Sequence, residues 1–333
     1  MIALVFILSL LSLPLVSMDP YILHILIIAT IFAIYAASWD LLAGFAGQLS
    51  LGHALFFGVA AYTAALLNKH FGLPPLITIP CGGLAAVMIG LIAGLPALRL
   101  RGFYLALVTL SFPIILTGLI YLFPKFTGGE LGLYNIDPLS GSRVLDYYIV
   151  LVVMLVSVFT MYKLTDAESK HVRTGVIFHA IREDEIAARV SGIYTSRYKL
   201  LAFAVSGIFA GIAGGLYAHF IRVSGPSTLE LLFSFYPILW TVFGGIATIY
   251  GPVVGVYILY PLLEILGFHP WGEATRFIIF SLILMITLFF MPQGVSTWIR
   301  DKIEIRCPRC KLINMSTRYS CRACRASLRP EKE

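Results

Sequence analysis

Long apolar runs follow one another along most of the 333 residues, and they constrain the fold more than any other feature of the sequence. A helix that crosses a bilayer needs about 20 mainly apolar residues. Only 12% of the residues are charged, whereas about 25% are charged in an ordinary soluble domain. The sequence therefore predicts an all-α polytopic membrane protein with about 8–10 transmembrane or re-entrant helices. The runs occupy residues 2–17, 21–38, 53–68, 76–98, 103–123, 146–162, 198–220, 231–249, 251–268 and 275–298.

The first run, residues 2–17, has no Lys or Arg in front of its apolar core, and the next run follows at Tyr21. A secretory signal peptide begins with a positively charged segment. We therefore expect residues 2–17 to be a retained first span.

The basic residues are distributed unevenly. Of the 24 Lys and Arg residues, 19 lie in three regions, from Arg99 to Arg101, from Lys163 to Lys199 and from Arg300 to Lys332. Short basic loops of membrane proteins stay on the cytoplasmic side. We therefore expect a multi-pass protein of the cell (inner) membrane with both termini in the cytoplasm. Its transmembrane domain is residues 1–299, with a cytoplasmic loop at about 164–198, and its cytoplasmic tail is residues 300–333.

A charged stretch, Ala180 to Ile193, interrupts the apolar sequence. Its residues form helices readily, and Gly192 stands where a helix would end. A solvated helix between two spans is a place where another protein can act on the bundle. The alternative is a surface helix with no partner. The candidate contact residues are Arg182, Glu183, Asp184, Glu185, Ala187, Ala188 and Gly192.

Polar side chains also occur near or within membrane depth, directly after the run 21–38. Such groups are costly in a bilayer unless they line a cavity or pair with the backbone. They indicate either a translocation pathway or an interfacial loop between two spans. The candidates are Gln48, Ser50, Gly52 and His53.

Glycines and a proline interrupt the sequence around residue 245. Pro252 lacks a backbone donor, and Gly244 and Gly245 permit an unwound crossing. We expect a discontinuous helix here, with carbonyl groups exposed to a translocation pathway. Ordinary close packing between helices is the other explanation for these glycines.

The tail contains two C-x-x-C pairs separated by ten residues, and the fifth cysteine, Cys81, lies in an apolar run. Four thiolates in this arrangement suit tetrahedral Zn²⁺. Two disulfides are an alternative, although cytoplasmic thiols stay reduced, and a rubredoxin-like iron centre is another. We expect a small zinc-knuckle module with the ligands Cys307, Cys310, Cys321 and Cys324.

Seven motifs carry a resemblance to a known family. In this order and spacing they resemble the M-type permeases of ATP-driven importers for branched-chain amino acids, from about residue 30 to Gly294. The zinc-knuckle tail is an addition to that pattern. The motifs are Gly44–His53, Leu98–Ala106, Thr127–Gly129 with Gly132–Leu133, Ala180–Ile193, Lys199–Phe203, Ala213–Ala218, and Gly244–Ile246 with Gly251–Pro252.

The resemblance implies a permease subunit in the lipid bilayer that is not an enzyme. Its implied partners are a second homologous permease, two cytoplasmic ATP-binding subunits and an extracytoplasmic binding protein. That binding protein would deliver a small-molecule substrate, a branched-chain or other hydrophobic amino acid. The chain has no G-x-x-x-x-G-K-[ST] phosphate loop, so we expect it to bind no nucleotide. Permeases for urea or short amides share these motifs and are the alternative.

In this family a cytoplasmic coupling helix docks in a cleft of the ATPase. Ala187 and Ala188 with Gly192 look like the core of that motif. Its Glu is expected at position 186, where this chain has Ile, and Glu185 stands one position earlier. Upstream, Val176 follows Gly175 where relatives commonly carry Arg.

An ion-coupled secondary transporter or channel is the competing class. The spans offer only Asp40 and Glu264 as candidates for proton coupling. The scarcity of carboxylates argues against that class, which would also leave the charged stretch at 180–193 unexplained.

Overall fold

The structure is a computed structural model that describes residues 10–12, 14, 19–97, 100, 102–166, 173–267, 272–291, 293–307, 309, 313–315, 324 and 327. Most of the predicted first span, residues 2–17, lies outside the described residues, as do Arg99 and Arg101.

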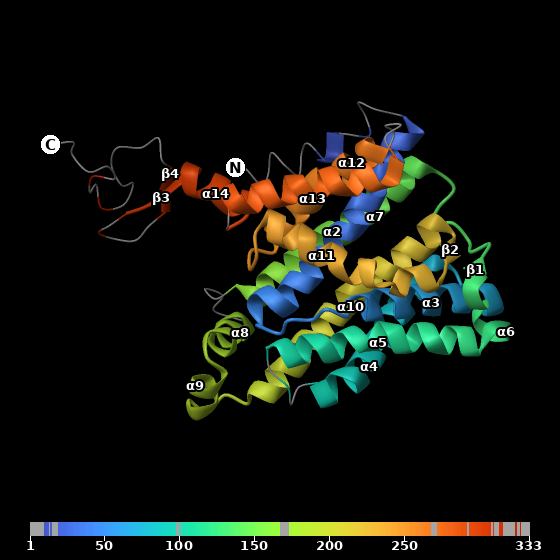
Figure 1. Cartoon of the computed structure of the whole chain (residues 1–333), viewed down its shortest axis with the longest axis horizontal. Helices are drawn as coiled ribbons and strands as arrows, with labels where there is room; N and C mark the ends of the chain where they lie inside the picture. The colour runs from blue at the N-terminus through green and yellow to red at the C-terminus, as the bar shows by residue number, and fades with distance from the viewer. Residues whose placement is uncertain are drawn as a thin grey trace.

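Helices dominate the described chain (Figure 1). The principal ones are α2 (Pro20–Asp40), α3 (Ala54–Phe71), α4 (Pro75–Ala97), α5 (Phe103–Leu122), α7 (Arg143–Thr165), α10 (Thr195–Ile221), α11 (Leu231–Gly244), α12 (Tyr250–Gly267) and α13 (Gly272–Phe290). Shorter elements are η1 (Leu41–Phe45), α6 (Pro124–Thr127), η2 (Gly129–Leu131), β1 (Leu133–Tyr134), α8 (Thr174–Glu183), α9 (Glu185–Val190), β2 (Val223–Ser224), η3 (Pro226–Leu229), α14 (Val295–Ile303), β3 (Glu304–Arg306) and β4 (Ile313–Met315).

Six helical segments among the described residues are long and apolar enough to cross a membrane. They begin at Pro20, Pro75, Phe103, Arg143, Thr195 and Tyr250. The apolar helices Leu231–Gly244 and Phe277–Phe290 are shorter. Helix α3 also has 18 residues, but its last turn contains Asn68, Lys69 and His70, which reduce its mean hydropathy. The prediction of an all-α polytopic membrane protein is therefore confirmed.

Helix α2 forms the centre of the bundle and is buried over most of its length. It packs against α7, α10, α11 and α12, and α10 packs in turn against α3 and α4. Glycines allow these close approaches. A Cβ atom on Gly211 of α10 would lie 2.8 Å from the Cα of Gly83, and one on Gly214 would lie 2.1 Å from the Phe57 carbonyl oxygen. Small residues of this kind let helix backbones pack closely where lipid supplies no hydrophobic drive.

The bundle has two distinct ends. At one end, β1 pairs antiparallel with β2, and His219 Nε2 lies 2.6 Å from Thr78 Oγ1. At the other end lie α8 and α9, and the β3–β4 hairpin projects beyond this same end (Figure 1). The connection after α2 and the start of α10 also lie at the α8–α9 end, which therefore brings the predicted functional segments together.

Candidate functional site

The segment after α2 leaves the helix but stays inside the protein. Helix α2 continues into the five-residue π-helical turn η1, and residues 46–53 then run without regular structure to the start of α3. Short π-helical turns occur frequently at functional sites. Along this segment Gln48, Ser50 and His53 are all buried.

Neighbouring helices bond the backbone of this segment. The indole Nε1 of Trp39 donates to the Ser50 carbonyl oxygen at 2.8 Å, and the Leu51 amide donates to Thr109 Oγ1 at 3.1 Å. Ser38 Oγ lies 2.9 Å from His53 Nε2 and donates to the Tyr35 carbonyl oxygen. Because the single Ser38 proton is used there, His53 Nε2 is the donor and its Nδ1 is an acceptor. These bonds satisfy part of the irregular backbone, as is needed where it is enclosed by protein.

Three side-chain atoms of this segment are buried without a hydrogen-bond partner among the described residues. They are Gln48 Oε1, Ser50 Oγ and His53 Nδ1. Buried polar atoms are normally bonded, so an unpaired one calls for an explanation such as a ligand or an unseen water. Three on six consecutive residues make the segment from Gln48 to His53 the strongest candidate for contact with a small molecule.

A small cavity adjoins this segment. It has a volume of about 10 Å³, enough for about one water molecule. A Cβ atom on Gly52 would lie 1.8 Å from the Thr109 carbonyl oxygen, so only glycine fits between the segment and α5. The cavity is lined by Ser50, Gly52, Leu55, Phe56, Gly90, Gly94, Thr109, Phe112 and Phe203. Thr109, which both lines the cavity and bonds the segment, was missed in the sequence because no local pattern distinguishes it from Ser111 and Thr117 in the same apolar run.

The structure places Gly244 and Gly245 away from this cavity. Helix α11 ends at Gly244 and α12 begins at Tyr250, which agrees with the expected break. The Gly244 carbonyl accepts from Ser296 Oγ, and the Gly245 carbonyl accepts from Thr248 Oγ1. These carbonyls are therefore occupied in this conformation, and a place for the two glycines in a pathway stays a prediction.

Asp40 stabilises the same break. Its carboxylate accepts backbone N–H bonds from Ala247, Thr248 and Ile249 at 2.6, 3.0 and 3.0 Å. Ala247 and Ile249 have φ angles of 60° and 54°, which side-chain-bearing residues rarely adopt. The side chain of Asp40 is fully buried, and its carboxylate satisfies three backbone N–H donors of this strained loop. Asp40 therefore connects the end of α2 to the loop between α11 and α12.

The charged stretch at 180–193 forms two helices rather than the single helix expected. Helix α8 ends at Glu183, and Asp184 adopts an extended conformation with φ −152° and ψ 109°. Its carboxylate accepts from the amides of Ile186 and Ala187 and so caps α9. Asp is a favoured N-cap residue, so the sequence did carry the signal for this break. Gly192 follows α9 with a φ of 85°, as expected of a helix end.

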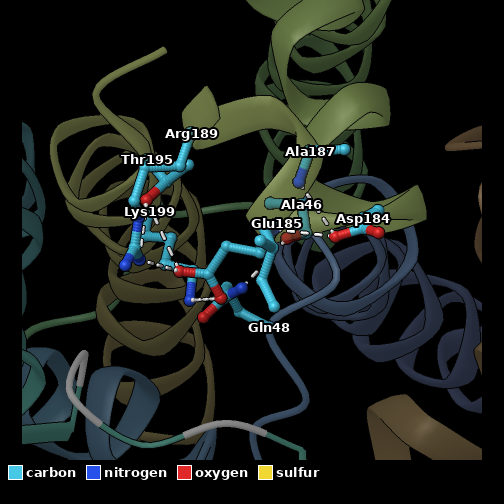
Figure 2. A network of polar contacts seen from close by, with 9 residues as sticks. Ala46, Gln48, Asp184, Glu185, Ala187, Arg189, Thr195 and Lys199 are labelled. Carbon is cyan, nitrogen blue, oxygen red and sulfur yellow. Dashed lines mark hydrogen bonds and ion pairs between the residues drawn. The ribbon is translucent and has the colours of Figure 1, made fainter. Parts of the chain in front are cut away.

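Glu185 is turned inward and holds α9 against α10 (Figure 2). Its Oε2 lies 2.6 Å from Lys199 Nζ, and its Oε1 lies 2.9 Å from Arg189 Nη2. The Lys199 side chain is 2% exposed and that of Glu185 is 14% exposed, whereas that of Arg189 is 55% exposed. Thr195, at the start of α10, bonds to the same cluster. Glu185 was predicted to contact a partner protein, but its carboxylate pairs with Lys199 and Arg189 of the same chain.

The side chains that α9 presents to solvent include large apolar ones. Ile186 and Val190 of α9 are 60% and 84% exposed, while Ala188 is buried, and Tyr194, directly before α10, is 71% exposed. Arg182, Glu183 and Ala187 are also exposed. The predicted contact residues did not include Ile186 and Val190, although their spacing of four places both on one helical face. Large apolar side chains exposed on one face of a helix outside the spans are typical of a protein-binding surface.

The two candidate regions touch. A Cβ atom on Gly47 would lie 3.1 Å from the Cα of Arg182, so the start of the 46–53 segment rests on the last turn of α8. Figure 2 accordingly shows Ala46 and Gln48 beside Glu185. A displacement of α8 and α9 would therefore reach the buried segment directly, and α10 through the Glu185–Lys199 ion pair.

Two of the four tail cysteines are described, and their sulfur atoms lie 3.4 Å apart. These are Cys307, which is buried, and Cys324. The other two predicted ligands, Cys310 and Cys321, lie outside the described residues. No group of three or more metal-ligating side chains occurs within the described part of the chain.

Comparison with known proteins gives consistent matches. The profile of the family described as branched-chain amino acid transport system / permease component matches residues 21–288. The high-affinity branched-chain amino acid transport system permease protein LivM of Salmonella typhimurium is 28% identical over 311 residues, covering 84% of this chain and 71% of that protein. LivM of Escherichia coli is 28% identical over 306 residues, covering 83% and 70%. A probable branched-chain amino acid transport permease protein LivH of Methanocaldococcus jannaschii is 25% identical over 261 residues, covering 72% and 79%. No solved structure matches significantly.

Proposed function

This chain belongs to the family of permease components of branched-chain amino acid transport systems, and we propose that it carries branched-chain or other hydrophobic amino acids. It is a multi-pass permease subunit of an ATP-binding cassette importer. In the proposed assembly it pairs with a second homologous permease, and two separate ATP-binding subunits supply the energy. An extracytoplasmic binding protein delivers the amino acid to the β1–β2 end.

The orientation follows from charge. Of the 24 basic residues, 17 lie in the sequence between Lys163 and Lys199 or between Arg300 and Lys332. The described parts of these segments, including α8, α9 and the β3–β4 hairpin, lie at one end of the bundle. Basic loops favour the cytoplasmic side. In this proposal the α8–α9 end and both termini therefore face the cytoplasm, where the ATP-binding subunits act.

The observation that carries the proposal is the two-sided character of α9. One side presents Ile186 and Val190 to solvent, and the other is fastened to α10 through Glu185 and Lys199. An apolar surface can seat in a cleft of the ATPase, and a buried ion pair transmits the movement of that cleft to a membrane span. Asp184, Gly192 and the Ala187–Ala188 pair shape the element, while Arg182 and Glu183 are placed to meet the partner's charges.

The proposed pathway runs along the 46–53 segment. Gln48 Oε1 and His53 Nδ1 are acceptors without partners, and Ser50 Oγ is either donor or acceptor. The α-ammonium group of an amino acid has three donors, which can bond to acceptors of this kind. The adjoining cavity holds about one water in this conformation. Gly52 and the apolar residues around it must therefore separate when substrate passes.

Urea or a short amide is the alternative substrate, because either also supplies N–H donors to these acceptors. The apolar lining by Leu55, Phe56, Phe112 and Phe203 favours a hydrophobic side chain over urea. Ion coupling has less support. The carboxylate of Asp40 already accepts three backbone N–H bonds, so its protonation would remove part of the support of the α11–α12 loop.

The test is reconstitution of the chain with the products of its neighbouring genes in lipid vesicles. We expect ATP hydrolysis stimulated by a binding protein loaded with leucine, isoleucine or valine, together with uptake of the labelled amino acid. Urea and acetamide, supplied with the same binding protein, serve as controls and should not be taken up. Uptake that persists without ATP, or the absence of an ATP-binding partner, would contradict the proposal.

A further inference from the structure

Helix α14 has polar residues against the bundle and apolar residues on its outer side. Ser296 and Thr297 are buried, and their hydroxyl groups donate to backbone carbonyl oxygens. Trp298 and Ile299, by contrast, are 38% and 39% exposed. A helix on the surface of a soluble protein has the opposite arrangement, with apolar residues inward and polar residues in water. The reversed polarity indicates that the outer side of α14 meets apolar surroundings.

Helix α14 lies beside the ends of two apolar helices. Its Ser296 hydroxyl donates to the carbonyl of Gly244, which is the last residue of α11. Arg300 Nη1 donates to the hydroxyl of Tyr250 at 3.2 Å, and Tyr250 is the first residue of α12. Helix α12 is long and apolar enough to cross a membrane. These contacts therefore place α14 at the level where the spans leave the membrane.

The outer side of α14 follows an exposed apolar surface on α13. Phe289 and Phe290, the last two residues of α13, are 81% and 70% exposed, and Met285 of the same helix is 63% exposed. Residues 291–294 separate these phenylalanines from α14 in the sequence. Large apolar side chains exposed along an apolar helix of a membrane protein suit contact with lipid, and Trp is enriched where lipid meets water. Trp298 therefore stands where the lipid-facing surface of α13 reaches the interface.

A lysine accompanies this tryptophan. Lys302 Nζ lies 3.6 Å from the centroid of the Trp298 ring, and Lys302 and Arg300 are both exposed. A lysine at a membrane surface packs its stem on apolar groups and extends its charge to the headgroups. With Asp301 between them, the residues from Arg300 to Lys302 carry a net charge of +1. Basic residues beside a membrane attract the anionic lipids of the cytoplasmic leaflet.

We propose that α14 lies on the membrane surface, with Trp298 and Ile299 inserted at the boundary of the acyl chains and Lys302 against the phosphate of an anionic lipid. Helices with one apolar side bind the interface in this way. Lipid is favoured over a protein partner because the apolar side of α14 continues the exposed surface of α13. The assignment to the cytoplasmic leaflet rests on the orientation proposed above, whereas the lipid contact itself does not depend on the transported substrate.

The first experiment places Trp298 relative to lipid. The full-length chain is reconstituted in phosphatidylcholine bilayers whose acyl chains carry bromine, which quenches tryptophan fluorescence on contact. The difference between the native chain and Trp298→Phe gives the emission of Trp298. We expect this emission to be quenched, and most strongly by bromine near the headgroups. Trp39 and Trp240 are each 2% exposed and should be quenched little.

Two results would overturn the membrane contact. One is a Trp298 emission that brominated lipid does not quench in the reconstituted chain. The other is quenching that disappears when the chain is assembled with a second permease and ATP-binding subunits, because a protein partner would then cover α14. Quenching that persists in the assembled transporter supports lipid as the occupant.

The second experiment tests the headgroup. Brominated phosphatidylglycerol and brominated phosphatidylcholine are compared as quenchers of Trp298, and their ratio cancels any direct effect of Lys302 on the emission. We expect the anionic lipid to bind beside Trp298 about fivefold more tightly, and Lys302→Gln to remove this preference. Lys69→Gln is the matched control, because Lys69 Nζ also lies over a ring, 4.6 Å from the centroid of Tyr134, but at the β1–β2 end. Equal binding of both lipids by the native chain, or the same loss of preference in both variants, would refute the headgroup contact.

Discussion

Lys199 Nζ lies 2.6 Å from Glu185 Oε2, so helix α9 is tied to the start of span α10 by a nearly buried ion pair. Removing one partner of a buried pair leaves the other charge uncompensated and costs roughly 3–5 kcal/mol. We expect Glu185→Gln to lower the melting temperature of the chain. It should also reduce the amount of amino acid transported per ATP hydrolysed, because α9 no longer moves α10.

Arg189→Gln is the control for this prediction. Arg189 contacts the same carboxylate, but its side chain is 55% exposed, and exposed pairs contribute about 0–1 kcal/mol. The exchange of charges in Glu185→Lys with Lys199→Glu should recover part of the coupling ratio. Equal stability and equal coupling in Glu185→Gln and the native chain would refute a connecting role.

A carboxylate on the exposed face of α9 should prevent recruitment of the ATP-binding subunits. Val190 is 84% exposed, so Val190→Asp leaves the fold of the isolated chain unchanged. Burial of an unpaired charge in an apolar cleft is costly, and co-purification of the ATP-binding subunits should therefore fall at least tenfold. Leu131→Asp is equally exposed, at 82%, and lies at the opposite end of the bundle. It should leave recruitment intact, and a similar loss in both variants would argue against docking through α9.

The spans were predictable because membrane insertion depends on the length and apolarity of a local run, as for α2 and α10. The break at Asp184 was also encoded locally, through an N-cap residue at the start of α9. The Glu185–Lys199 pair was not, because it joins residues 14 positions apart and depends on how α10 packs. Likewise, Thr109 lies 58 residues from its partner Leu51, and no local pattern in the sequence relates them.

Ser50 and Ser38 should respond oppositely to the loss of their hydroxyl groups. Ser50 Oγ is buried with no partner among the described residues, so its desolvation is not offset by a hydrogen bond. Ser50→Ala removes that penalty, and the free energy of unfolding should stay equal or rise slightly. Ser38 Oγ bonds to Tyr35 and His53, so Ser38→Ala should cost about 1–3 kcal/mol. If Ser50 contacts the substrate, uptake by Ser50→Ala should fall despite its stability. Thermal unfolding and vesicle uptake measure the two effects, and full uptake by Ser50→Ala would remove Ser50 from the pathway.

Gly52→Ala tests how closely the buried segment must approach α5. The added Cβ would lie 1.8 Å from the Thr109 carbonyl oxygen, and backbone cannot yield as a flexible side chain does. Overpacking of this kind costs roughly 1–3 kcal/mol, and we expect lower stability together with a strong loss of uptake. Gly118→Ala in the same helix α5 meets nothing within 4 Å and should raise stability slightly, since alanine favours a helix by about 0.5–1 kcal/mol over glycine. Comparing the two variants separates the clash with Thr109 from the general effect of adding a methyl group. Equal uptake by Gly52→Ala and Gly118→Ala would show that the 46–53 segment can move away from α5 without loss of transport.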